Sequence, residues 1–146
     1  MEESEVTSLT IRKGIAMQNR IFSSDNPKAI KAQTYGWRNA IHYMAPARLA
    51  GVGDLCADKS PSCELYCLGI TSGAATYYPS VIRSRIAKAR RFMKERKAYL
   101  NDMSRSIKAE IRASDRANVK LCVRPNGSTD IPFEGIRDAD GLTLME

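Results

Sequence analysis

Residues 79–124 read PSVIRSRIAKARRFMKERKAYLNDMSRSIKAEIRASDRANVKLCVR, and their pattern predicts the fold. Apolar residues recur at gaps of three, four and seven, the period of one face of an α-helix. The stripe comprises Ile82, Ile86, Ala89, Met93, Leu100, Met103, Ile107 and Ile111. Pro79 suits a first helical turn, and no Gly or Pro interrupts residues 80–117. We therefore expect one long amphipathic helix over residues 80–117.

Strand-like segments lie on both sides of that helix. Residues 119–124 (VKLCVR) are short, apolar and β-branched, and residues 39–44 (NAIHYM) end just before Pro46. The order strand, helix, strand predicts a βαβ unit with parallel strands and a right-handed crossover. We expect the α/β class, with a sheet that resembles part of an open parallel sheet or an incomplete TIM-like barrel. The domain is expected over residues 34–146, preceded by an arm or helix over residues 1–33.

Three cysteines follow the first expected strand, with the spacing C-x6-C-x3-C. Cys56, Cys63 and Cys67 can converge because Pro61 and its flanking serines allow the chain to fold back. Thiolates suit zinc or an iron–sulfur cluster, and three ligands leave a fourth position open. We expect these residues to bind one metal centre, with their sulfurs close together even without metal. The alternatives are a disulfide and a closed structural site, whose fourth ligand would come from Cys122, His42, Asp54 or Asp58.

A polar loop follows the second expected strand. Because the carboxyl ends of parallel strands lie at one edge of a sheet, we expect this loop and the cysteine loop to face each other across a pocket. Its candidate ligand-binding residues are Arg124, Asn126, Ser128 and Asp130. Asp130 would accept an ammonium group and Arg124 would bind a carboxylate. The alternative is that Asn126 and Gly127 form an ordinary turn.

Positive charge is concentrated in the helical segment. The net charge is +7, and residues 83–116 hold twelve Lys and Arg against four acidic residues. A nucleic-acid-binding module would use Arg90, Arg91, Lys94 and Lys97 on the helix over 80–117. The simpler interpretation is a solvated helix face, since aromatic residues are scarce there. No P-loop or dinucleotide fingerprint is present, and a single histidine does not favour a catalytic triad.

The acidic start of the chain shows no secretory signal, and no apolar run approaches the roughly 18 residues that span a membrane. We therefore expect a cytoplasmic protein without a membrane partner. In a reducing compartment, clustered cysteines more often bind metal than form disulfides.

The segments 36–47 (GWRNAIHYMAPA) and 123–134 (VRPNGSTDIPFE), with the cysteine spacing and basic helix between them, resemble the phage gene product 88 family. The resemblance covers residues 34–136 and departs at His42, where members are usually aliphatic, and at Pro125, where they usually have an apolar residue. It implies that the chain corresponds to an N-terminal part, whose fold a C-terminal half or a second subunit would complete. It also implies a location in the bacterial host if the gene is phage-encoded. The family has no settled activity, so whether the protein is an enzyme is left open.

The order of cysteine loop, helix, strand and polar loop is also similar to that of radical S-adenosylmethionine enzymes. Those enzymes hold a [4Fe–4S] cluster on three cysteines, usually with the tighter spacing C-x3-C-x2-C. The similarity implies an iron–sulfur cluster and S-adenosylmethionine as cofactors, with Asn126, Ser128 and Asp130 near the methionine amine. Fold-level similarity of this kind is weak evidence for function.

Overall fold

The computed structural model describes residues 20–137 and 140–144. Its elements, in chain order, are β1 (Phe22–Ser23), α2 (Pro27–Gln33), β2 (Trp37–His42), α3 (Pro61–Leu65), α4 (Leu68–Thr71), α5 (Ala74–Tyr77), α6 (Pro79–Lys94), α7 (Arg96–Arg116), β3 (Lys120–Arg124) and a 3-10 turn (Phe133–Gly135). Of the expected N-terminal arm or helix over 1–33, α2 and β1 are seen, and residues 1–19 lie outside the described part.

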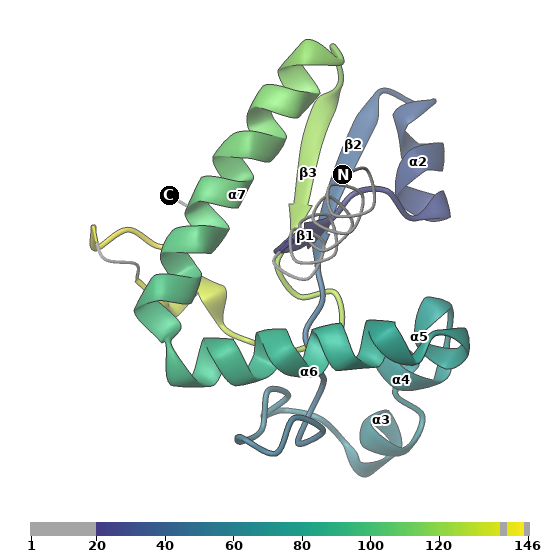
Figure 1. Ribbon diagram of the computed structural model, residues 1–146, viewed down its shortest axis with the longest axis vertical. Coiled ribbons are helices and arrows are strands. Elements are labelled where there is room, and N and C mark those ends of the chain that lie inside the picture. Colours follow the sequence, from purple (N-terminus) through teal and green to yellow (C-terminus); the bar gives the residue numbers. More distant parts are fainter. Residues whose placement is uncertain (1–19, 138–139, 145–146) are drawn as a thin grey trace, which may run out of the picture.

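The strands form one open sheet in the order β1-β2-β3. β2 and β3 are parallel, with Trp37 paired with Lys120 and Ile41 with Arg124, whereas β1 is antiparallel to β2. Figure 1 shows α7 alongside the sheet and α6 crossing beyond the carboxyl ends of β2 and β3. The predicted α/β class, both main strands and their parallel pairing are therefore confirmed, in a sheet that is open rather than closed into a barrel.

The prediction of one uninterrupted helix over 80–117 is wrong. Glu95 has φ −130° and ψ 48°, which lies outside the helical region and separates α6 from α7. The turn allows both helices to pack against the same core: the rings of Phe92 and Tyr99, one from each helix, are 5.7 Å apart in an edge-on arrangement. The burial of these two rings against each other stabilises the bent arrangement. A straight helix would bury less apolar surface, because its second half would extend away from the sheet.

The core lies between the sheet and these two helices. Phe22, Phe92, Tyr99, Met103 and Phe133 are almost fully buried in it. No helix within the described residues is long and apolar enough to cross a bilayer.

A cysteine pocket at the carboxyl edge of the sheet

The segments that follow β2 and β3 continue side by side beyond the sheet. The amide of Asp130 donates to the carbonyl oxygen of Leu55 at 2.9 Å, and Cys56 and Asp130 form an isolated parallel bridge. The cysteine loop and the polar loop therefore meet at one edge, as the order of the strands predicted.

All three cysteines of the motif line a single cavity of about 250 Å³. Its wall also includes Pro46, Ala47, Arg48, Leu49, Lys59, Glu64 and Ile70. Each of the four cysteines of the chain is a free thiol, so no disulfide forms. The motif thus forms one thiol-lined pocket of mainly apolar character.

Each thiol is held in a different way. The amide of Ala47 donates to Cys56 Sγ at 3.3 Å, and burial raises the pKa of this thiol. Cys63 is exposed on α3, where its amide donates to Ser60 Oγ at the helix start. Cys67 precedes α4, close to Gly69, where an added Cβ would lie 3.4 Å from Cys67 Sγ.

The three thiols share one cavity, but they are not arranged as a metal site. Within the described residues, no three His, Cys, Asp or Glu side chains are arranged to hold a metal ion. Neither α3 nor α4 contains a buried residue, so the segment carrying Cys63 and Cys67 is weakly attached to the core. The loop is therefore loosely held at the point where these two cysteines enter the pocket wall.

Charged groups surround the mouth of the pocket. Asp54 pairs with Lys59 and with Arg48, and the hydrogen bond from Lys59 lowers the pKa of Asp54. Asp54 also accepts the amide of Cys56 at 3.0 Å, so this candidate fourth ligand is already engaged. The other candidates differ in position: Asp58 is exposed, and Cys122 is on β3.

The polar loop uses most of its side chains internally. Asn126 Nδ2 donates to the carbonyl oxygen of Ile131 at 2.8 Å, and Asn126 Oδ1 accepts from Thr129 and Ile131. Ser128 donates to the carbonyl oxygen of Met44 at 2.6 Å. Asp130 is exposed and bridged to Cys56, but Arg124, Asn126, Ser128 and Asp130 do not belong to the wall of the cysteine cavity, so the polar loop lies beside this pocket without lining it.

The sequence profile of a family described as Gene product 88 matches residues 19–140, most of the chain. The chain belongs to the gene product 88 family. No similar protein was found among curated sequences or solved structures.

In this gene product 88 domain, His42 organises the polar loop from inside the core. His42 Nδ1 donates to the carbonyl oxygen of Pro125 at 2.8 Å, because a carbonyl can only accept. His42 Nε2 then accepts from the hydroxyl of Tyr99 at 2.7 Å, and the amide of Gly127 donates to the carbonyl oxygen of His42 at 2.8 Å. His42 is therefore a structural clasp rather than a metal ligand.

Burial shifts both titrating partners of this clasp. Desolvation lowers the pKa of His42 to about 4 and raises the pKa of Tyr99 well above its ordinary value. His42 is thus held neutral at pH 7. The sequence alone did not indicate this role, since His42 and Tyr99 are 57 residues apart.

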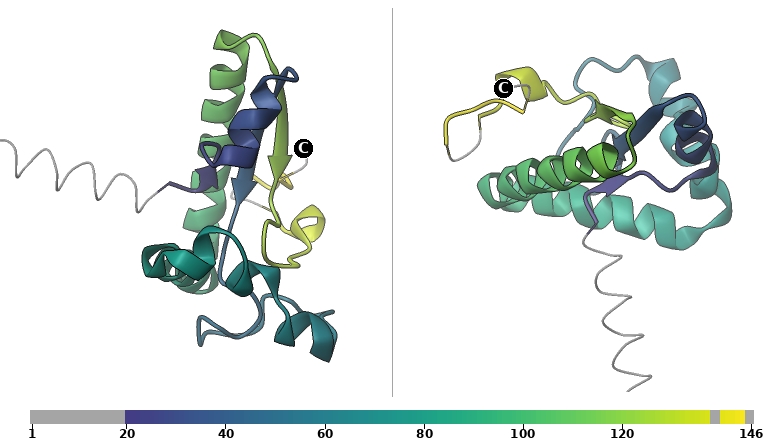
Figure 2. Two further views of the ribbon diagram at one scale, coloured as in Figure 1. Left: turned by 90° about the vertical axis from the view of Figure 1, so that its right-hand side faces the viewer. Right: turned by 90° about the horizontal axis from the view of Figure 1, so that it is seen from above.

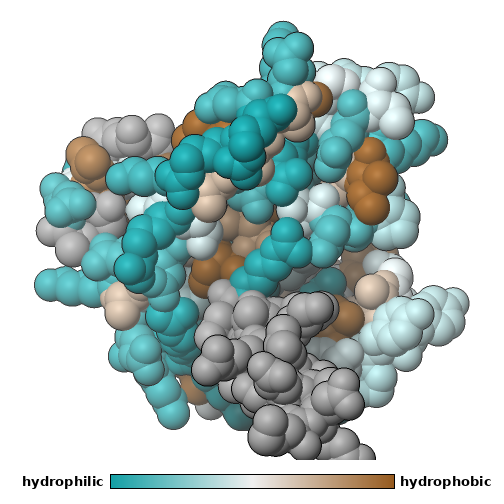
Figure 3. Space-filling view, turned by 45° about the horizontal axis from the view of Figure 1, so that its top comes forward, coloured by the Kyte–Doolittle hydropathy of each residue, from teal (hydrophilic) through white to brown (hydrophobic). Residues whose placement is uncertain are grey.

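The basic residues predicted for nucleic-acid binding lie around the bend between α6 and α7. Arg90 donates to the carbonyl oxygen of Ala50 at 2.9 Å, and Arg91 pairs with Asp102 and Glu95. Lys94 and Lys97 are exposed, and neither has an ion pair or a side-chain hydrogen bond among the described residues. The bend also means that the positive residues of α6 and α7 do not form one straight stripe, although hydrophilic side chains cover much of α7 in Figure 3.

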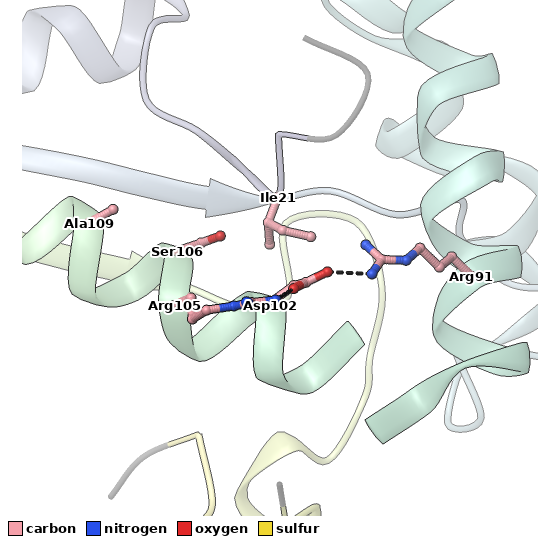
Figure 4. Close-up of a pocket in the computed structure, with 6 residues that line it drawn as sticks. All are labelled: Ile21, Arg91, Asp102, Arg105, Ser106 and Ala109. Atoms are coloured by element: carbon pink, nitrogen blue, oxygen red, sulfur yellow. Dashed lines mark hydrogen bonds and ion pairs between the residues drawn. The ribbon is translucent and has the colours of Figure 1, made fainter. Parts of the chain in front are cut away.

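A second cavity, of about 430 Å³, lies where the two helices meet (Figure 4). Its wall consists of Ile21, Arg91, Asp102, Arg105, Ser106 and Ala109. Asp102 pairs there with both Arg91 and Arg105, which lowers the pKa of Asp102. The pair between Arg91 and Asp102 links α6 to α7 and so stabilises the bend, whereas Arg105 and Asp102 both lie on α7.

Proposed function

We propose that Cys56, Cys63 and Cys67 together bind one soft metal centre, an iron–sulfur cluster or zinc. The observation that supports this proposal is the single cavity of about 250 Å³ lined by all three free thiols. Three thiols give a donor set typical of these centres and unlike the oxygen donors that magnesium or calcium prefers.

The pocket fits such a centre in two further respects. Since α3 and α4 bury none of their residues, Cys63 and Cys67 can move toward Cys56 at little cost in packing. The amide of Ala47 already donates to Cys56 Sγ at 3.3 Å, an interaction that strengthens when sulfur carries negative charge. A metal would reverse the raised pKa of Cys56, so binding would release protons and weaken as the pH falls.

Asp130 supports an extension of this proposal to S-adenosylmethionine. A cluster held by three cysteines supplies one open iron position, which in radical S-adenosylmethionine enzymes accepts the amino and carboxylate groups of that cofactor. In this chain Asp130 is bridged to Cys56, which lines the pocket, and its exposed carboxylate could accept an ammonium group bound nearby. Asn126 and Ser128 would act indirectly, by holding the loop that carries Asp130.

The test is metal analysis and ultraviolet–visible spectroscopy of the full chain purified without oxygen. An iron–sulfur centre absorbs broadly near about 400 nm, whereas zinc is colourless, so the spectrum distinguishes the two metal centres. We expect Cys56→Ser, Cys63→Ser and Cys67→Ser each to lose most of the metal. Cys122→Ser is the matched control, because Cys122 is a free thiol on β3, away from the cavity, and this variant should retain full loading.

Equal metal content in all four variants would refute the shared centre, as would wild-type protein that stays metal-free after reconstitution with iron and sulfide or with zinc. For the extension, S-adenosylmethionine should bind wild type more tightly than Asp130→Asn at equal metal loading. Equal affinities would remove Asp130 from the proposal and leave the metal centre standing.

A further inference from the structure

The face of the β2–β3 pair that points away from α7 is only partly covered. On β2, Arg38 and His42 point toward α7, where they bond to Glu110 and Tyr99. Side chains alternate along a strand, so Trp37 and Asn39 point to the opposite side. Figure 2 shows α7 on one side of the sheet and α2 beside the upper part of β2, so the face away from α7 is open mainly over β3.

The parallel register places residues of β3 on that same open face. Lys120 is paired with Trp37 and Cys122 with Asn39, and Arg124 lies two residues further along β3. Leu121 and Val123, which alternate with them, pack against the core. Ile41, which pairs with Arg124, is buried beside Gly127 of the loop after β3. The accessible part of this face therefore consists of Trp37, Asn39, Lys120, Cys122 and Arg124, and we refer to these residues as the sheet platform.

The sheet platform combines an exposed aromatic ring with unpaired positive charge. Trp37 is 44% exposed, and the ammonium group of Lys120 lies 5.4 Å from its ring centroid. Lys120 and Arg124 are exposed, and no described carboxylate forms an ion pair with either. The platform itself contains no acidic residue.

This composition is unusual for its place in the fold. Parallel strands are normally buried on both faces and are then apolar throughout. Here the face toward α7 is covered, and its polar residues Arg38 and His42 are paired with Glu110 and Tyr99, whereas the other face carries an indole, an amide and two cations. A face of this kind is suited to a polar, negatively charged partner with flat groups.

We propose that the sheet platform binds single-stranded nucleic acid. An unpaired base can stack on Trp37, since every base has a π-face, and Lys120 and Arg124 can neutralise phosphates. Four residues of strand separate these cations by about 13 Å, so they would contact different phosphates along one strand. A duplex keeps its bases stacked internally and cannot offer one to the indole. The proposal is independent of any metal in the cysteine pocket.

Trp37 is the only tryptophan of the chain, so its fluorescence reports on the platform directly. The experiment titrates the full chain with an oligothymidylate and with an oligouridylate, and measures both Trp37 quenching and the anisotropy of a labelled oligonucleotide. We expect quenching to accompany binding, with duplex DNA of the same length bound more weakly. Trp37→Ala should weaken binding by roughly 5- to 150-fold, the range for loss of one stacked base.

The charged residues are tested through salt dependence. Each phosphate contact on a single strand contributes about 0.7 to the slope of log affinity against log salt, so Lys120→Gln with Arg124→Gln should lower that slope by about 1.4. Trp37→Phe keeps an aromatic face and should restore most of the affinity lost in Trp37→Ala. Circular dichroism of each variant confirms that the sheet is intact.

Lys94→Gln with Lys97→Gln is the matched control, because it removes two exposed cations at the helix bend. We expect this control to retain Trp37 quenching and affinity close to those of wild type. Loss of binding in the control with none in the platform variants would refute the proposal and assign binding to the helices. Absence of binding at low ionic strength, or binding without Trp37 quenching, would also overturn it.

Discussion

Acidification from pH 7 to pH 5 should destabilise this domain through one side chain, His42. In the folded protein its pKa is lowered to about 4 by burial, against an ordinary value of 6.5. The unfolded chain therefore takes up a proton near pH 6.5 while the folded chain does not. Stability is lost as the pH falls through this interval, because the unfolded state binds more protons.

The size of the effect follows from the two pKa values. The pKa of His42 is 6.5 in the unfolded chain and about 4 in the folded protein. At about 1.4 kcal/mol for each unit of difference, the folded state loses about 3 kcal/mol of stability once the pH lies below both values. By pH 5 the loss should be about 2 kcal/mol, which is a large part of a typical unfolding free energy of about 5–15 kcal/mol. The ion-paired Asp54 and Asp102 contribute at lower pH, since the pKa of each carboxyl group is lowered from its ordinary value.

Urea unfolding followed by circular dichroism at pH 7, 6 and 5 measures this loss. His42→Asn cannot titrate in this range, so its unfolding free energy should change less than that of wild type over the same interval. His42 is the only histidine of the chain, and the nuclear magnetic resonance signal of its ring reports its pKa without assignment work. An equal loss in both proteins, or a ring that titrates near 6.5, would show that the clasp with Tyr99 and Pro125 does not hold His42 neutral.

Three further variants test the packing around the site. Gly127→Ala should destabilise by about 1–3 kcal/mol in urea unfolding, because a Cβ there lies 2.7 Å from the carbonyl oxygen of His42, whereas Gly135→Ala, with nothing within 4 Å, should not. Glu110→Ala should lower the unfolding free energy by about 2–4 kcal/mol in the same assay, because it removes the 2.6 Å ion pair and leaves the largely buried Arg38 without a carboxylate. A loss under about 1 kcal/mol would show that this pair contributes no more than an ordinary surface ion pair. Burial lowers the pKa of Lys88 to about 8, so between pH 8 and 10.5 the unfolded chain binds more protons and the stability of the wild type rises with pH. Lys88→Met should lack this rise, and a variant with the same alkaline profile as wild type would contradict the reasoning.

The local patterns of the sequence were sufficient for the elements and their order. Helical periodicity identified the residues of α6 and α7, and short β-branched runs identified β2 and β3. These patterns are local, because each depends on which side chains of one segment share a face. The chain order then required β2 and β3 to be parallel, and so brought Cys56 and Asp130 to one edge of the sheet.

The bend at Glu95 depended on the tertiary structure. No Gly or Pro marks it, and the sequence hint is only the missing apolar turn between Met93 and Leu100. The bend forms because Phe92 and Tyr99 are buried against each other in one core, a gain that no single segment contains. The same non-local packing selected the partners of His42, which come from α7 and from the loop after β3.

Only the folded chain, too, decided which polar groups are used internally and which are presented to solvent. Asn126 and Ser128 looked like ligand-binding residues in the sequence, yet their side chains bond to backbone carbonyls, because buried carbonyl groups near the sheet edge need donors. Trp37 and Lys120 were not among the residues expected to bind a ligand, yet the sheet brings them together on the face away from α7. Sequence periodicity predicts which residues share a face, whereas the packing of the other segments determines what lies against that face.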